Sequence, residues 1–130
     1  GVDSLTMRIL ALDIGARRTG VAFVDTDNNI PLPLDTVVSD SMEAMVEHVS
    51  AIGVARKIDF LLIGLPLLPS GQEGSQSTYV RTASAKFVEQ GFEVVFFDER
   101  YTSSHNAPFD GDARAACQLL TTYLQTQAHS

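Results

Sequence analysis

The sequence predicts an α/β fold: a mixed β-sheet, with its first three strands antiparallel and its later strands parallel, flanked by helices. Three observations support this prediction. The first part of the chain contains segments rich in β-branched residues and leucine, separated by turn residues. The later part alternates segments of helical periodicity with continuous apolar runs. A set of strands followed by helix–strand alternation is typical of a mixed sheet covered by helices.

The first two predicted strands form an antiparallel hairpin. MRILALDIG (7–15) and TGVAFVDTD (19–27) both have strand character, and a tight turn from Gly15 to Thr19 would join them. PLPLDTVV (31–38) is expected to form a third strand. Proline has no N–H to donate to a neighbouring strand. The segment is therefore expected either to be an edge strand or to carry its prolines only at its first residues.

The first predicted helix runs from Ser41 to Lys57, and either Asp40 or Ser41 can cap its start. Apolar residues recur along it at helical spacing, namely Met42, Met45, Val46, Val49 and Ile52. The continuous apolar run DFLLIGLP (59–66) is typical of a central strand covered on both faces. The segment LPSGQEGSQ (68–76) that follows has the composition of a loop.

A second helix is expected over residues 76–90, with Gly91 as its stop. Its inward-facing residues are predicted to be Val80, Ala83, Phe87 and Val88. FEVVFFD (92–98) is expected to be another buried strand, and the last helix is expected over residues 112–126. The apolar face of that helix is predicted to consist of Ala113, Ala116, Cys117, Leu120, Tyr123 and Leu124.

Length and composition set further expectations. A chain of 130 residues, 45% of them hydrophobic, fits one domain over residues 7–127, and residues 1–6 are interpreted as an N-terminal extension or cloning remnant. The single cysteine cannot form an internal disulfide, which favours the cytoplasm. No segment approaches the roughly 20 apolar residues of a membrane span. A net charge of −7 argues against a surface that attracts nucleic acid everywhere, yet suits an acidic site that holds cations.

Acidic residues stand at the ends of three predicted elements. Asp13 ends the first strand, Asp98 and Glu99 end the last strand, and Asp112 opens the last helix. The strand order allows the first and last strands to be neighbours, and sites in open α/β sheets gather beyond the carboxyl ends of strands. Converging carboxylates at such an edge can hold two Mg²⁺ or Mn²⁺ ions about 3.5–4 Å apart, an arrangement that hydrolyses phosphodiesters.

The same acids also fit simpler interpretations. An acid at the end of a strand is commonly a solvated turn residue, and Asp98 can pair with Arg100. Asp112 fits the role of a helix N-cap, because a short acidic side chain can accept the N–H groups at the start of a helix. Spacing alone leaves the metal site and these structural roles as open alternatives.

Glycines and arginines mark two loops. In DIGARRTGVA (13–22), Gly15 can adopt a positive φ, and Arg17 and Arg18 would stand at a hairpin tip, where guanidinium groups suit phosphate. A surface turn with solubilising charge is the alternative. GLPLLPSGQEGSQ (64–76) is a long loop, expected to be mobile, at the carboxyl end of a strand, and it leads into a helix N-terminus, where anions are favoured.

Taken together, four motifs resemble the YqgF/RuvX family. They are RILALDIGARRTGVAF, FLLIGLPLLPSGQEGSQSTYVRTASAKF, VVFFDERYTS and DARAACQLLTTYL, and the resemblance covers nearly all of residues 7–124. Members of that family are candidate Holliday-junction-resolvase-like nucleases with the RNase H-like fold. In bacteria they are tied to maturation of the small-subunit ribosomal RNA precursor. The resemblance therefore implies an RNase H-like fold and a nucleic-acid partner, either structured RNA or branched DNA.

Carried over by position, the resemblance implies catalytic and metal-binding roles for Asp13, Glu99 and Asp112, with Asp98 as a further metal candidate. The implied cofactor is a pair of Mg²⁺ or Mn²⁺ ions. The implied structural loop residues are Gly15, Gly20, Gly64, Pro66, Gly71 and Gly74. The candidate nucleic-acid contacts are Arg17, Arg18, Arg81 and Arg100.

Three functions follow as hypotheses. The leading one is a metal-dependent nuclease that matures the 5′ end of pre-16S rRNA or cuts Holliday-junction-like substrates, the latter favouring a homodimer. Family members usually place a helix and a basic run between the DER motif and the last acid, whereas only residues 100–111 intervene here. That difference motivates a second hypothesis, an RNase H-like nucleic-acid- or protein-binding module with weak or no turnover. A third, a nucleotide-binding fragment related to actin and sugar kinases, needs a second lobe that 130 residues do not offer.

Overall fold

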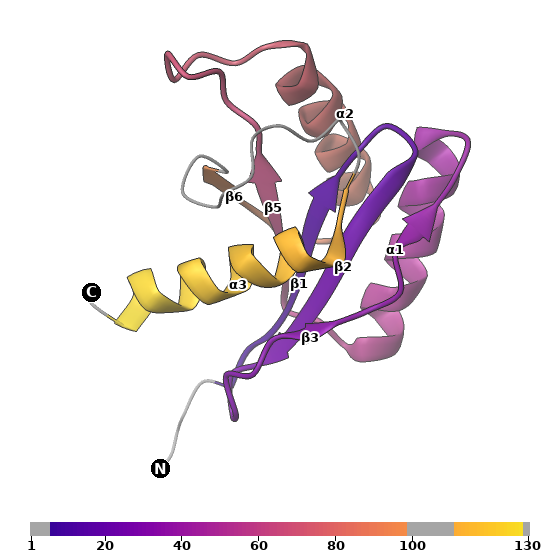
Figure 1. Ribbon diagram of the computed structural model, residues 1–130. Helices are drawn as coiled ribbons and strands as arrows, with labels where there is room; N and C mark the ends of the chain where they lie inside the picture. Colours follow the sequence, from indigo (N-terminus) through magenta and orange to yellow (C-terminus); the bar gives the residue numbers. More distant parts are fainter. Residues whose placement is uncertain (1–5, 99–110, 129–130) are drawn as a thin grey trace.

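The structure is a computed structural model and describes residues 6–98 and 111–128. Its elements are β1 Arg8–Ile14, β2 Arg18–Asp25, β3 Leu32–Pro33, β4 Val37–Val38, α1 Met42–Arg56, β5 Phe60–Leu65, α2 Ser75–Glu89, β6 Val94–Asp98 and α3 Ala113–Ala128. The strands form one mixed sheet in the order β3-β2-β1-β5-β6, with β4 also paired to β2. Helices α1 and α2 cover one face and α3 crosses the other (Figure 1). The predicted α/β class is confirmed.

The predicted hairpin is confirmed, because β1 and β2 pair antiparallel with Asp13 opposite Gly20 and Ile14 opposite Thr19. The single third strand was wrong. Two short strands, β3 and β4, pair with β2 in its place. The paired residues of β3 end at Pro33, and the next residue, Leu34, still donates its N–H to the Val21 carbonyl at 2.9 Å.

Helix α1 begins as predicted at a serine cap. The Ser41 hydroxyl accepts the Ala44 N–H at 3.1 Å, and Lys57 ends the helix in the left-handed conformation with φ of 55°. The buried face comprises Met45, Val46 and Val49, which lie at the predicted spacing. These three residues pack in the core between the helices and the sheet.

Strand β5 is an interior strand of the sheet, buried along its whole length and parallel to both β1 and β6. The prediction that its neighbour β6 is a buried strand was wrong. β6 is only half-buried, because it is the last strand in the described order and has one partner. The first and last strands, which the predicted element order allowed to be neighbours, have β5 between them.

Helices α2 and α3 bury apolar faces on opposite sides of the sheet. In α2, Phe87 is fully buried, whereas Val88, predicted to face inward, is 55% exposed because it lies one residue further around the helix. In α3, the fully buried residues are Ala116, Leu119 and Leu120, and Leu119 had not been predicted. In the described part of the chain, no helix is both long and apolar enough to cross a membrane.

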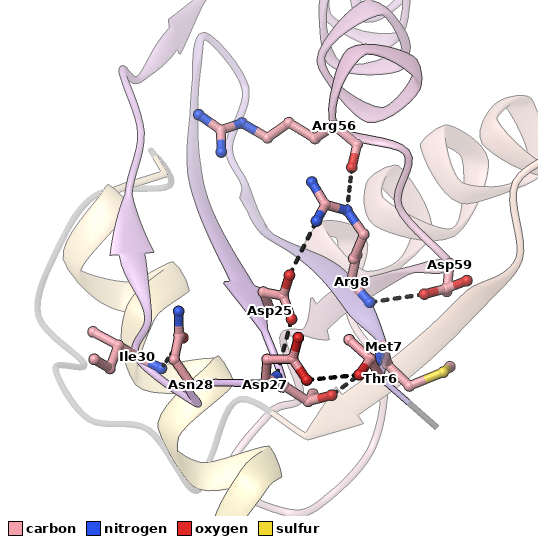
Figure 2. A network of polar contacts seen from close by, with 10 residues as sticks. Thr6, Met7, Arg8, Asp25, Asp27, Asn28, Ile30, Arg56 and Asp59 are labelled. Carbon is pink, nitrogen blue, oxygen red and sulfur yellow. Dashed lines mark hydrogen bonds and ion pairs between the residues drawn. The ribbon is translucent and has the colours of Figure 1, made fainter. Parts of the chain in front are cut away.

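A polar network fastens the edge of the sheet where β1 begins and β2 ends (Figure 2). The backbone N–H of Arg8 donates to Asp59 at 2.8 Å, while its guanidinium donates to the Arg56 carbonyl at 2.6 Å and to Asp25 at 3.0 Å. The guanidinium groups of Arg8 and Arg56 both lie over the Phe23 ring, 5.1 and 4.8 Å from its centroid, respectively. These arginines therefore support the fold at the end of β1 away from Asp13.

Candidate active site

Two of the predicted acids meet where β1 ends and α3 begins. Asp13 is half-buried near the end of β1, and its carboxylate oxygen Oδ2 accepts the backbone N–H of Asp112 at 3.0 Å. Because α3 starts at the next residue, the N-terminus of that helix lies against the Asp13 carboxylate. The partial positive charge at a helix N-terminus stabilises a negative group there.

Asp112 also caps α3. Its side-chain oxygen Oδ1 accepts the Arg114 N–H at 2.8 Å, and its carbonyl oxygen accepts the Ala116 N–H at 3.1 Å. The structural alternative for Asp112 is therefore confirmed. The cap does not exclude a second role, because the side chain is exposed and Oδ1 is the oxygen that the cap uses.

Strand alternation assigns Asp98 and Asp13 to opposite faces of the sheet. Val95 and Phe97 pack in the cluster beneath α3, whereas Val94 packs beneath α1 and α2. Because side chains alternate along a strand, Asp98 belongs to the face of Val94, while Asp13 belongs to the face beneath α3. β5 also separates the two strands.

The remaining predicted acid, Glu99, and the predicted phosphate contact Arg100 lie outside the described residues. Over residues 6–98 and 111–128, no group of three His, Cys, Asp or Glu side chains is arranged to hold a metal ion. The structure therefore brings together Asp13 and Asp112, and the third ligand stays a prediction.

The hairpin between β1 and β2 presents Arg17 and Arg18, both exposed. A hydrogen bond from the Gly15 N–H to the Arg18 carbonyl, 3.0 Å long, closes the turn. The Tyr79 hydroxyl of α2 donates a longer bond of 3.5 Å to the Ala16 carbonyl. Gly15 does not use the positive φ that glycine permits, since the positive-φ glycines among the described residues are Gly71 and Gly91. Gly15 serves this turn through its N–H.

The predicted long loop between β5 and α2 is a closed turn. Leu67 and Glu73 pair across the turn as a single antiparallel β-bridge. The Gly71 N–H donates to the Leu68 carbonyl at 2.8 Å. Gly71 has φ of 89°, which favours glycine. The Ser77 hydroxyl of α2 donates to the Pro66 carbonyl.

The two other glycines predicted for this region have different surroundings. Gly64 lies inside β5, opposite Phe97 of β6. A side chain at Gly74 would meet the Leu68 side chain at 3.3 Å. Such a contact is tight, but Leu68 is 47% exposed and has room to move.

Arg81, a predicted phosphate contact, binds a carboxylate of the same chain. Its Nε and Nη2 donate to the two carboxylate oxygens of Glu73 at 2.8 and 2.7 Å, and its guanidinium lies 4.9 Å from the centroid of the Phe96 ring. The bidentate pair links the turn to α2, and the ring contact extends the link to β6. A phosphate bound by the same guanidinium edge would have to replace Glu73.

Glu73 is expected to titrate below the ordinary range of a glutamate. Hydrogen bonding from Arg81 lowers the pKa of Glu73. The stabilisation that this exposed pair supplies is therefore present above the ordinary glutamate pKa and is lost as the pH falls through the lowered value. Titration by ¹³C NMR should show the Glu73 pKa rising towards its ordinary value in Arg81→Gln. The Glu73 pKa should stay unchanged in the control Lys86→Gln. An equal change of this pKa in both variants would contradict the Glu73–Arg81 pair.

Gly111 was not predicted from the sequence to belong to the site. Its N–H donates to the Arg18 carbonyl at 2.7 Å, and it lies directly before the acid that opens α3. The available signal was the acid–glycine–acid sequence just before a helix.

Cys117, also on α3, is half-buried, and burial raises the pKa of its thiol, which fits the predicted packing role rather than a nucleophile.

Comparisons with known proteins point to one family. Residues 7–126 match the family described as RuvX, Holliday junction resolvase. A protein of Sulfurihydrogenibium sp. (strain YO3AOP1), named as a candidate pre-16S rRNA nuclease, is 35% identical over 141 residues, which cover 95% of this chain and 93% of that protein. A protein of the same name from Chloroflexus aurantiacus is 38% identical over 96 residues, covering 73% of this chain and 63% of the relative.

A solved structure supports the fold. The structure described as T. thermophilus RuvC in complex with Holliday junction substrate superposes with a TM-score of 0.60 at 12% sequence identity. The match covers 93% of this chain and 96% of that one. At this identity the likeness concerns the fold alone, and it confirms the predicted RNase H-like architecture.

Proposed function

Because the chain belongs to the RuvX family of Holliday junction resolvases, we propose that it is a metal-dependent nuclease acting on structured nucleic acid. We place the precursor of 16S rRNA first among its substrates, since its relatives carry that name, and Holliday-junction-like DNA second. The observation that carries the proposal is the hydrogen bond from the Asp112 N–H to the Asp13 carboxylate, which joins the ends of β1 and α3.

The donor set fits a divalent cation. The Asp13 carboxylate contacts the backbone of Asp112, so two acidic residues stand at one place in the fold, and Mg²⁺ and Mn²⁺ prefer carboxylate oxygen ligands. We assign the metal-holding and catalytic roles to these two residues and Glu99, and we leave out Asp98 because it belongs to the other face of the sheet. When bound, a pair of such ions supplies an activated water and stabilises the leaving oxygen.

The chain's own residues would place the substrate. The N-terminus of α3 stabilises the negative charge of Asp13, which keeps this carboxylate ready to act as a ligand. Arg17 and Arg18, exposed at the hairpin tip that follows β1, are the proposed phosphate contacts. Since the chain carries a net charge of −7, binding should depend on this local basic tip and weaken steeply as salt rises.

The test is cleavage by the purified protein. Labelled RNA spanning the 5′ end of pre-16S rRNA, a four-way DNA junction and a linear DNA duplex would each be incubated with Mn²⁺, with Mg²⁺ and with a chelator. We expect cleavage of the structured RNA with metal and none with chelator. Failure to cut any substrate under any condition would contradict the proposal. Cutting of the junction in paired, symmetric positions would point to a homodimer, which sedimentation would measure.

A second candidate function is a nucleic-acid- or protein-binding module without turnover. The cap that Asp112 provides for α3 favours it, because the cap alone accounts for an acid at this position. Calorimetric titration with Mn²⁺ separates the two functions. A nuclease site should bind two ions and the module one or none.

Replacing Asp112 with serine is expected to separate its two roles. Serine is as good an N-cap as aspartate but cannot replace the carboxylate as a metal ligand. Asp112→Ser should therefore unfold in urea at nearly the wild-type concentration and lose cleavage. Asp112→Ala should lose cleavage and about 1 kcal/mol of stability. Wild-type cleavage by Asp112→Ser would reduce Asp112 to a cap.

A further inference from the structure

We propose that Gly111 is a positioning residue of the candidate site, because the lack of a side chain there lets α3 begin in contact with Asp13. The inference rests on the proposed function to the extent that Asp112 is a metal ligand. Gly111 itself touches neither substrate nor metal in this proposal. It acts through the backbone that carries Asp112.

The space around Gly111 is filled by backbone. A Cβ atom on Gly111 would lie 1.9 Å from the Asp13 carbonyl oxygen, 2.6 Å from the Arg18 carbonyl oxygen and 2.6 Å from the Gly20 nitrogen. All three atoms belong to the paired strands β1 and β2, which cannot swing aside as the end of a flexible side chain can. Any side chain at this position must therefore displace the start of α3.

Gly20 makes the reciprocal contact from the sheet. A Cβ atom on Gly20 would lie 2.1 Å from both the carbonyl carbon and the carbonyl oxygen of Asp112, and 2.5 Å from its nitrogen. Gly20 lies in the extended backbone of β2, so the requirement at this position is space rather than a positive φ. The space that Gly20 leaves is the same space that Gly111 leaves, seen from the sheet and from the helix.

This close approach holds the start of α3 against the Asp13 carboxylate. It permits the hydrogen bonds from Gly111 to the Arg18 carbonyl at 2.7 Å and from Asp112 to the Asp13 carboxylate at 3.0 Å. A methyl group at position 111 would push both donors away from the sheet and move Asp112 away from the Asp13 carboxylate. The rest of α3 would stay docked, since Ala116, Leu119 and Leu120 are held in the apolar cluster beneath it.

The experiment compares Gly111→Ala with Gly91→Ala. At Gly91 the φ of 99° strains any side chain, but no atom lies within 4 Å of the added Cβ, so this control loses stability without disturbing the site. Manganese affinity, measured by calorimetry, should fall about 10–100-fold in Gly111→Ala, as is typical when the support of a ligand is lost. It should stay at the wild-type value in Gly91→Ala. Excess Mn²⁺ should restore cleavage to Gly111→Ala, and unchanged manganese affinity in that variant would overturn the proposal.

Amide hydrogen exchange provides a measurement that needs no metal. In the wild-type protein, the amides of Gly111 and Asp112 should both be protected. In Asp13→Ala, Asp112 should lose protection while Gly111 keeps it, because only Asp112 donates to the Asp13 carboxylate. Fast exchange of both amides in the wild type would overturn the proposal. If the wild type binds no Mn²⁺, the proposed function fails, and faster exchange of the Asp112 amide in Gly111→Ala than in Gly91→Ala then decides whether Gly111 sets this contact.

Discussion

Replacing Asp13 with asparagine is expected to abolish metal-dependent cleavage and leave the fold intact. The asparagine side-chain oxygen can still accept the Asp112 N–H, which the aspartate accepts at 3.0 Å, so α3 keeps its anchor. The negative charge, however, is lost, and a divalent cation binds a neutral amide much more weakly than a carboxylate. Losing several kcal/mol of metal-derived stabilisation corresponds to a fall in kcat of about 10³-fold or more.

The matched control is Asp59→Asn. Asp59 lies before β5, beside the start of β1, where its carboxylate accepts the Arg8 N–H at 2.8 Å. The substitution makes the same change of charge at the opposite end of β1 and should leave kcat unchanged. Thermal unfolding of both variants checks that each is folded. Cleavage by Asp13→Asn at the wild-type rate would remove Asp13 from the site.

Replacing Phe87 with alanine is expected to cost about 3–5 kcal/mol of unfolding free energy, the largest stability effect that we anticipate for one side chain. Phe87 of α2 is fully buried in the core between the helices and the sheet. Its ring packs edge to face on that of Phe92, with the ring centroids 6.3 Å apart. Phe92 in turn packs closely against Gly53 of α1. Loss of the Phe87 ring would leave a cavity whose lining cannot close without moving both helices.

Val88→Ala is the control, one residue along the same helix. Val88 is 55% exposed, and its substitution should change stability by less than about 0.5 kcal/mol. Urea unfolding followed by circular dichroism measures both variants. Equal losses for the two would mean that the inner face of α2 has been assigned to the wrong residues.

The elements with local signals were predictable. The hairpin follows from two strand-like segments on either side of a short glycine-bounded turn, and α1 follows from a serine cap and apolar spacing. Burial of β5 follows from its unbroken apolar run. In each case the determining interactions lie within a few residues of one another, so a single sequence contains them.

The misjudged features depend on contacts between distant residues. Strand order has no local signal, so the placement of β5 between β1 and β6 was not foreseen, and with it the separation of Asp98 from Asp13. Gly111 was missed for the same reason, because its neighbours are backbone atoms of Asp13, Arg18 and Gly20. The contact between Asp13 and Asp112 was predicted only indirectly, from the expected arrangement of the first strand and the last helix.

The hydrogen bond from Asp112 to Asp13 spans 99 positions of the chain, and this separation bears on how the protein is made. During translation the first hairpin emerges long before α3, so the apolar surface of Ala11, Ala22 and Val24 that α3 later covers is exposed on the nascent polypeptide. The two acids meet only after α3 has left the ribosome. A chain truncated before α3 would keep all of the described strands and could not assemble the site.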